Sequence, residues 1–109
     1  MKKTGFLIIL CTAPNPATAS QIANTLVNEH LAACCNIIPG LQSIYSWDGQ
    51  VCTAEEVLII VKTHAAVYKK IEHRIQEIHP YEVPEILAFS VRDGQTDYLK
   101  WVGDYVKSD

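Results

Sequence analysis

A long hairpin constrains the fold of this chain more than any other feature. Residues 47–50, "WDGQ", contain Asp-Gly, which suits the positive φ angles of a type I′ turn between antiparallel strands. The strand-like arms within residues 31–47 and 51–63 run for about a dozen residues, whereas strands usually have roughly 3–10. Such arms overhang a chain of 109 residues and leave edges that another subunit can cover. Pro39-Gly40 in the first arm predicts a bulge or an exposed edge.

The remaining segments predict two further strands and three helices. Residues 6–10, "FLIIL", are continuously apolar, as expected for a strand covered on both faces, and residues 85–91 form the other strand. Residues 15–30 begin with Asn-Pro and continue with apolar residues at steps of three and four, which predicts an amphipathic helix. The same periodicity predicts helices that begin at Thr63 and at Thr96.

The order of these elements is βαββαβ followed by a terminal helix. It predicts an α+β fold of the ferredoxin-like, split-βαβ plan, in which one antiparallel sheet carries helices on one face. A chain of 109 residues, 49% of them hydrophobic, fits a single domain over residues 1–109. A domain this small gains from oligomerisation, because it buries a limited share of its own surface.

The charge balance argues against nucleic acid as a partner, because 9 Lys and Arg face 12 Asp and Glu and no basic run occurs. We expect no membrane partner either, since no segment approaches the ~20 apolar residues of a membrane span. Four cysteines without a C-x-x-C pattern indicate reduced thiols and a cytoplasmic location. The alternative, a secretory signal over residues 1–14, is disfavoured because its apolar run, residues 6–11, is shorter than the ~7–15 residues required.

The stretch "IHPYEVPEILAF", residues 78–89, is the main candidate site, because it places an imidazole, a phenol and two carboxylates around two prolines. The imidazole can ligate a metal or transfer a proton, the carboxylates can hold a cation, and the phenol can donate a hydrogen bond. The alternative is a stiff connector in which the imidazole caps the preceding helix. The candidate side chains are His79, Tyr81, Glu82 and Glu85.

Other candidate positions lie at strand ends. Cys11 follows the first strand, where ligands can gather, with an inert buried thiol as the alternative. Lys62 lies near residues 79–85 if the two strand ends share an edge, and it then attracts an anion or pairs with a glutamate. A solvated lysine is the alternative. Tyr45 and Trp47 share one face near the hairpin tip, so we expect a partner subunit to bury them.

No catalytic motif is found in the sequence. The patterns G-x-S-x-G and H-E-x-x-H and the P-loop are all absent from it. We can name no nucleophile–base pair, and we therefore expect no enzyme. Glu55 and Glu56 are expected to be solvated.

Five stretches give the chain a resemblance to a known family. They span nearly the whole chain in order, and their combination is specific, although any single piece is weak. The chain resembles the CutA divalent-cation tolerance family. The stretches are "CTAPNPATA" (11–19), "LAACCNIIPGLQSIYSWDG" (31–49), "EEVLIIVKT" (55–63), "HPYEVPEIL" (79–87) and "YLKWV" (98–102).

The resemblance implies a homotrimer in which the long hairpin strands pair between subunits. It also implies a role in tolerance to divalent cations and the binding of copper or another divalent cation. The metal ligands that it implies are Cys11, Cys34 and His79, with Glu85 nearby. A further thiol proposed in the family before the "HPY" motif is missing here, since that region reads "EHRIQEI".

A second function follows by analogy, because the family resembles the trimeric PII-type signalling proteins. Those proteins bind small effectors in clefts between subunits. By that analogy, Lys62, Trp47, Tyr81 and Glu82 line a pocket for a small effector, with His79 and Glu85. A third alternative is a structural assembly protein whose trimer is only a scaffold.

The length of the hairpin predicts an oligomer that light scattering can detect. We expect the mass of a trimer at micromolar protein concentration, because the overhanging strand edges need a partner. A monomer under these conditions contradicts the argument from strand length.

Overall fold

The computed structural model describes residues 4–106, and the predicted domain over residues 1–109 extends beyond that part of the chain at both ends. The described residues form one four-stranded sheet with the order β2-β3-β1-β4, in which every neighbouring pair is antiparallel. The predicted α+β fold with a long β2–β3 hairpin is confirmed. The strands are β1 (Phe6–Ala13), β2 (Cys34–Trp47), β3 (Gln50–His64) and β4 (Ile86–Ser90).

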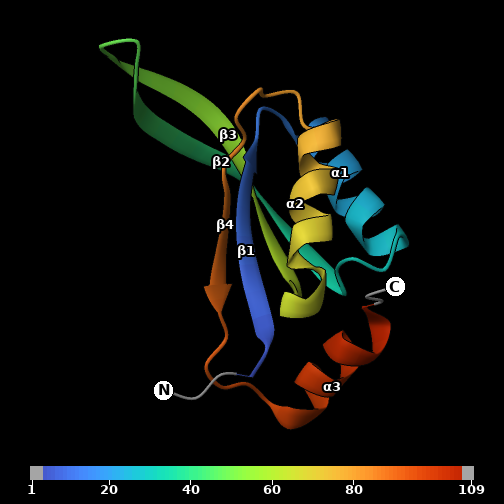
Figure 1. Ribbon diagram of the computed structural model, residues 1–109. Coiled ribbons are helices and arrows are strands. Elements are labelled where there is room, and N and C mark those ends of the chain that lie inside the picture. Colours follow the sequence, from blue (N-terminus) through green and yellow to red (C-terminus); the bar gives the residue numbers. More distant parts are fainter. Residues whose placement is uncertain (1–3, 107–109) are drawn as a thin grey trace.

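Two helices cover one face of the sheet. They are α1 (Pro16–Asn28) and α2 (Tyr68–Ile78), which lie side by side on that face (Figure 1). A short 3₁₀ helix, η1 (Ala65–Val67), leads into α2, and α3 (Thr96–Tyr105) lies at the end of the sheet opposite the hairpin tip (Figure 1). No helix in the described part of the chain is long and apolar enough to cross a membrane.

The hairpin of β2 and β3 projects beyond the rest of the molecule (Figure 1). Asp48 and Gly49 have φ angles of 51° and 76°, which confirms the predicted turn with two positive φ angles. The strand pairing is interrupted between Ile38 and Leu41, where Gly40 has a φ of 78°. The predicted bulge at Pro39-Gly40 is therefore confirmed, and glycine suits this left-handed backbone conformation.

The hydrophobic core lies between the sheet and helices α1 and α2. Alternate residues of β1 and β3 point into it, because neighbouring side chains of a strand face opposite sides. Ile71 and Ile75, four residues apart on α2, complete the core from the helix layer. The fully buried core residues of the central strands are Ile9, Cys11, Ala13, Ile59 and Val61.

The opposite face of the sheet is not covered by α1 or α2. The side chains of Leu87 and Phe89 on β4 are each 53% exposed there, and Ile38 on β2 is 45% exposed. Strand β2 and strand β4 also form the two edges of the sheet. This face therefore presents apolar side chains and two strand edges that remain available for a partner.

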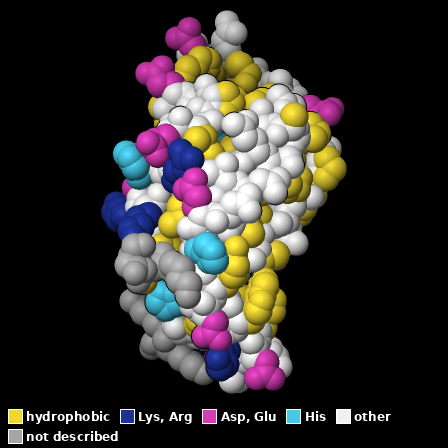
Figure 2. Space-filling view, turned by 90° about the vertical axis from the view of Figure 1, so that its right-hand side faces the viewer, with side chains coloured by type: hydrophobic (Ala, Val, Ile, Leu, Met, Phe, Trp, Pro, Cys, Tyr) yellow, Lys and Arg dark blue, Asp and Glu magenta, His cyan; other side chains and the backbone are white. Residues whose placement is uncertain are grey.

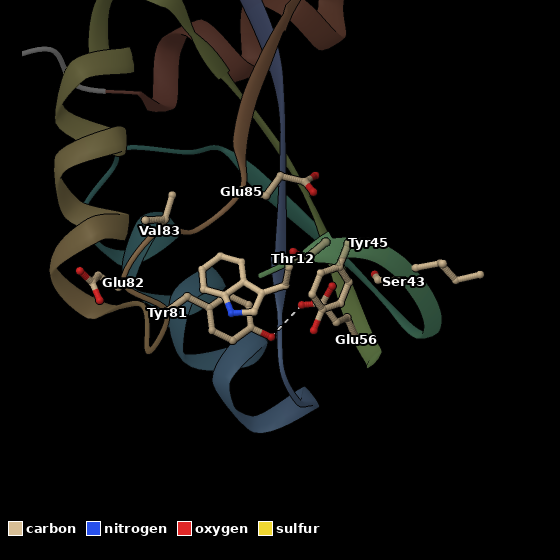
Figure 3. A pocket seen from close by; sticks show the side chains of 10 residues that line it. Thr12, Ser43, Tyr45, Glu56, Tyr81, Glu82, Val83 and Glu85 are labelled. Atoms are coloured by element: carbon tan, nitrogen blue, oxygen red, sulfur yellow. Dashed lines mark hydrogen bonds between the residues drawn. The ribbon is translucent and has the colours of Figure 1, made fainter. Parts of the chain in front are cut away.

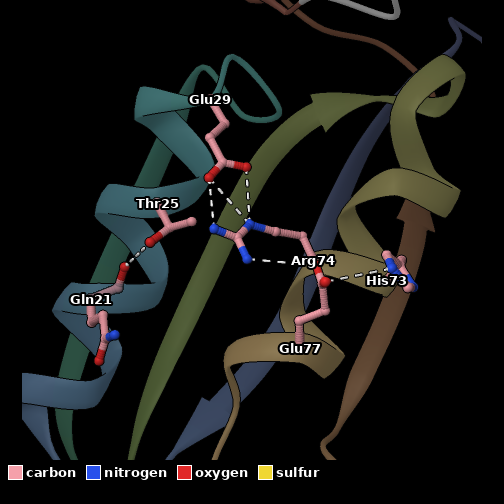
Figure 4. Close-up of polar contacts among 6 residues, drawn as sticks. All are labelled: Gln21, Thr25, Glu29, His73, Arg74 and Glu77. Atoms are coloured by element: carbon pink, nitrogen blue, oxygen red, sulfur yellow. Dashed lines mark hydrogen bonds and ion pairs between the residues drawn. The ribbon is translucent and has the colours of Figure 1, made fainter.

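Polar contacts join the two covering helices. The guanidinium of Arg74 on α2 contacts the carboxylate of Glu29, which follows α1, at 2.8 Å and also contacts Glu77 at 3.5 Å (Figure 4). The hydrogen bond from Arg74 lowers the pKa of Glu29, although burial acts in the opposite direction. An exposed pair of this kind contributes little to stability, because solvent screens it. Figure 2, a view of the helix-covered side, shows acidic and basic side chains intermixed rather than in a basic patch.

Some element boundaries differ from the prediction. Asn15 caps α1 as expected, with its side-chain oxygen accepting from the Thr18 N–H at 2.8 Å. Thr63 does not cap the next helix, because its hydroxyl donates to the Leu31 carbonyl in the core at 2.6 Å. The ring of His64 instead accepts from the Ala66 N–H at the start of η1.

Candidate functional site

A pocket of about 750 Å³ lies between the hairpin and the connection from α2 to β4. Figure 3 shows its walls, which come from the end of β1, from both hairpin strands and from residues 81–85. Four of the residues predicted from the sequence line it: Trp47, Tyr81, Glu82 and Glu85. The other lining residues are Thr12, Ser43, Ile44, Tyr45, Glu56 and Val83.

His79 fixes the position of the pocket loop. Its backbone N–H ends α2 by donating to the Ile75 carbonyl at 2.8 Å, and its ring is buried. The ring Nε2–H donates to the Thr12 carbonyl at 2.7 Å, while Nδ1 accepts from the Tyr81 N–H at 3.0 Å. A ring that donates at Nε2 and accepts at Nδ1 is the neutral tautomer. His79 thus anchors the loop to β1, and both of its nitrogens already have partners.

Tyr81 and Glu56 form the central polar contact of the pocket. The Tyr81 hydroxyl donates to Glu56 Oε2 at 2.7 Å (Figure 3). The expectation that Glu56 is solvated is wrong, because its side chain is only 9% exposed. Burial first, and then the nearby Glu56 carboxylate, raise the pKa of Tyr81 to about 12. Both causes disfavour the phenolate, so Tyr81 is a hydrogen-bond donor at neutral pH.

The pocket has an acidic and aromatic character. Glu82 and Glu85 are exposed, whereas Glu56 is buried, and none of the described lining residues is Lys, Arg or His. Within residues 4–106, Glu56 has no ion-pair partner, and its Oε1 atom has no hydrogen bond. A buried carboxylate with a single neutral partner favours the approach of a cation.

The cysteines predicted as ligands lie on opposite faces of the sheet. Cys11 pairs with Ile59 in the register and points into the core, whereas Cys34 pairs with Lys62 on the uncovered face. Burial, with smaller effects of the Glu85 and Glu56 carboxylates, raises the pKa of Cys11 to about 12. The Cys11 thiol is therefore protonated at neutral pH and has no access to solvent.

The described chain does not bring the predicted metal ligands together. No three His, Cys, Asp or Glu side chains in residues 4–106 lie close enough to hold one metal ion. Cys11 and Cys34 are separated by the sheet, and the His79 ring is occupied by Thr12 and Tyr81. Of the four predicted ligands, only Glu85 lines the pocket.

Lys62 lies outside the pocket of a single chain. Strands β3 and β4 are both antiparallel to β1, so the end of β3 and the start of β4 lie at opposite ends of the sheet. Lys62 lies six positions beyond Glu56, about 20 Å along the strand. Its ammonium donates to Asn36 and lies 4.0 Å from the Cys34 sulfur. The expected proximity of Lys62 to residues 79–85 is therefore wrong within one chain.

Sequence reasoning missed Glu56, the most buried acidic residue of the site. Strand alternation places Glu56 on the same face as Leu58 and Ile60, and its neighbour Glu55 on the other face. An acidic residue between the apolar residues Ala54 and Leu58 on one strand face was the available signal. The partner of Glu56 could not be found in this way, because Tyr81 is 25 residues away in the chain.

The family comparison agrees with this geometry. The CutA1 divalent ion tolerance protein family matches residues 7–105. The chain belongs to this family. The divalent-cation tolerance protein CutA of Thermus thermophilus is 45% identical over 95 residues, which cover 87% of this chain and 92% of that CutA. The CutA of Escherichia coli is 40% identical over 99 residues, or 91% and 88% of the two chains.

Solved CutA structures share the whole fold. The Thermus thermophilus Cut A1 structure has a TM-score of 0.92 at 42% identity and covers 94% of this chain and 99% of its own. CutA1 from Oryza sativa has a TM-score of 0.94 at 32% identity and covers 98% of each chain. The strand order and the hairpin of this CutA chain are therefore features of a known fold.

The contact between Tyr81 and Glu56 predicts the pH at which the Tyr81 hydroxyl of this CutA protein ionises. Tyr81 should lose its proton near pH 12, above the ordinary tyrosine pKa of about 10. Because the folded-state pKa is raised, the stability from this contact is complete below about pH 10 and decreases as the pH rises toward the folded value. The Glu56→Gln variant should lower the pKa of Tyr81, since the repelling charge is removed.

Ultraviolet absorbance titration of the parent, Tyr81→Phe and Glu56→Gln proteins measures this pKa. The difference between the parent and Tyr81→Phe isolates the Tyr81 step. A Tyr81 step at the ordinary tyrosine pKa in the parent contradicts the contact, as does a step that Glu56→Gln leaves unchanged.

Proposed function

We propose that this protein contributes to divalent-cation tolerance by binding the cation, copper among the candidates, in the acidic pocket. The observation that carries the proposal is the buried Glu56 carboxylate in a pocket whose described lining has no basic side chain. Binding of a cation offsets the unfavourable burial of that charge. The relatives from Thermus thermophilus and Escherichia coli are named for divalent-cation tolerance, which supports the same role.

The arrangement of the ligands favours a partly hydrated cation. Since no three ligating side chains converge in the described chain, we propose that Glu56 and Glu85 hold the ion while water fills its other positions. Carboxylates suit Cu²⁺ as well as harder divalent ions. A site that uses Cys11 or His79 requires the loop to leave β1, because that thiol is buried and that ring has two partners.

We also propose that the protein is a homotrimer. The support comes from the projecting hairpin, from the two free sheet edges and from the exposed apolar residues of the uncovered face. In a trimer, these edges pair and the apolar side chains leave water. Cys34 lies half-buried on that face. Of the predicted metal ligands, it is therefore the one whose site a neighbouring subunit can complete.

A second candidate function is the binding of a small effector in the same pocket, as in the PII-type proteins. The observation that favours it is size, because a pocket of about 750 Å³ is far larger than one ion requires and falls within the range of small-molecule sites.

If the trimer is instead only a scaffold, the pocket residues can be replaced without effect on any ligand. We propose no enzymatic reaction, and we propose a cytoplasmic location because all four cysteines are free.

Copper binding by pocket variants tests the proposal. The Glu56→Gln and Glu85→Gln variants should each weaken Cu²⁺ binding by about tenfold, because each removes a charged ligand. Glu55→Gln is the matched control, since Glu55 is exposed, lies next to Glu56 on β3 and is not part of the pocket. Calorimetric titration of the full chain measures all three affinities.

Two results contradict the assignment. The pocket is not the metal site if both pocket variants bind copper like the parent. A loss of binding in Cys34→Ser, with the pocket variants unaffected, moves the site to the uncovered face instead.

A further inference from the structure

The acidic pocket combines three carboxylates with three aromatic rings. The aromatic rings belong to Tyr45, Trp47 and Tyr81. The pairing register places Tyr45 and Trp47 on the same sheet face as Glu56, so the rings of the hairpin and the buried carboxylate face one space. Aromatic faces attract cations, Trp most strongly, and no described cation lies over any of these three rings.

The separation of the carboxylates defines the shape of the ligand. Figure 3 shows Glu82 across the pocket from Glu56 and Glu85, and the three carboxylates do not converge enough to hold one metal ion together. A single small cation can therefore engage only part of this charge. A ligand with several positive groups, joined by an apolar chain, can engage all of it.

The chemistry of Glu56 further narrows the class of cation. Oε2 accepts from Tyr81, while Oε1 has no hydrogen bond among the described residues and can accept one from a ligand. A primary or secondary ammonium group donates such a bond, whereas a quaternary ammonium group does not. A charge-assisted N–H···O bond is roughly twice as strong as a neutral one.

From these features we propose that the pocket binds an aliphatic diamine or polyamine. One ammonium group donates to Glu56 Oε1, a second lies near Glu82 or Glu85, and the methylene chain between them packs on the rings of Tyr45, Trp47 and Tyr81. The apolar side chains of Ile44 and Val83 complete the surface for that chain. This inference rests on the second candidate function, the binding of a small effector, and specifies its chemical class.

The test is a titration of the full chain with putrescine, with butanediol as the neutral control of the same length. Calorimetry should show saturable binding of putrescine and none of butanediol. In a Trp101→Phe background, Trp47 is the remaining tryptophan, and its fluorescence should change with putrescine over the same concentration range. The two readouts report the same site through independent signals.

Three variants assign the binding to the pocket. Glu56→Gln should weaken putrescine binding by about tenfold, and Trp47→Leu should weaken it several-fold. Trp47 is 67% exposed in the single chain, so its replacement leaves the hydrophobic core of that chain intact. Glu55→Gln makes the same charge change outside the pocket and should bind putrescine like the parent.

Several results overturn the inference. They are the absence of saturable putrescine binding, equal binding by Glu56→Gln and the parent, and equal losses in Glu55→Gln and Glu56→Gln. If the Trp47 fluorescence changes with protein concentration but not with putrescine, a second copy of the chain fills the pocket.

Copper titration of the same samples separates the two proposals, because copper binding without putrescine binding refutes only this inference. Putrescine binding without copper binding supports this inference and refutes direct cation binding as the basis of tolerance.

Discussion

The site depends on the buried carboxylate of Glu56, whose hydrogen-bond partner is the neutral hydroxyl of Tyr81. This contact exists only because the His79 ring holds the loop against the Thr12 carbonyl and so places Tyr81 above β3. The position of the loop and of Tyr81 follows from that pair of contacts. The second oxygen of this carboxylate, Oε1, has no hydrogen bond in the described chain, so it can accept one from the proposed cation.

The long hairpin is the second constraint, and it connects the pocket to assembly. Its strands of 14 and 15 residues reach beyond the sheet, so Tyr45 and Trp47 form one wall of the pocket with no described helix behind them. The same length leaves strand edges that the proposed trimer pairs. The proposed ligand binding and the proposed subunit association therefore use the same projecting element, and we expect a change in one to affect the other.

Sequence periodicity predicted the architecture well, because it depends on local rules. The Asp48-Gly49 turn, the bulge at Pro39-Gly40 and the Asn15 cap all follow from the backbone preferences of one or two residues. The partner of Glu56 and the distance of Lys62 from residues 79–85 could not be predicted in this way. Each depends on which strand ends meet, and that is settled only by the order β2-β3-β1-β4. The loop candidates Tyr81, Glu82 and Glu85 were found by their composition, but the fixed partners of His79 were not.

We propose that cations enter the pocket beside Glu56, and not the interior around Cys11. A crystal structure of the protein soaked with a copper salt tests it most directly, because anomalous scattering locates the metal. We expect an anomalous peak within ligand distance of Glu56 or Glu85, with the His79 ring still bonded to Thr12. A peak between Cys11 and a displaced His79 ring would contradict it.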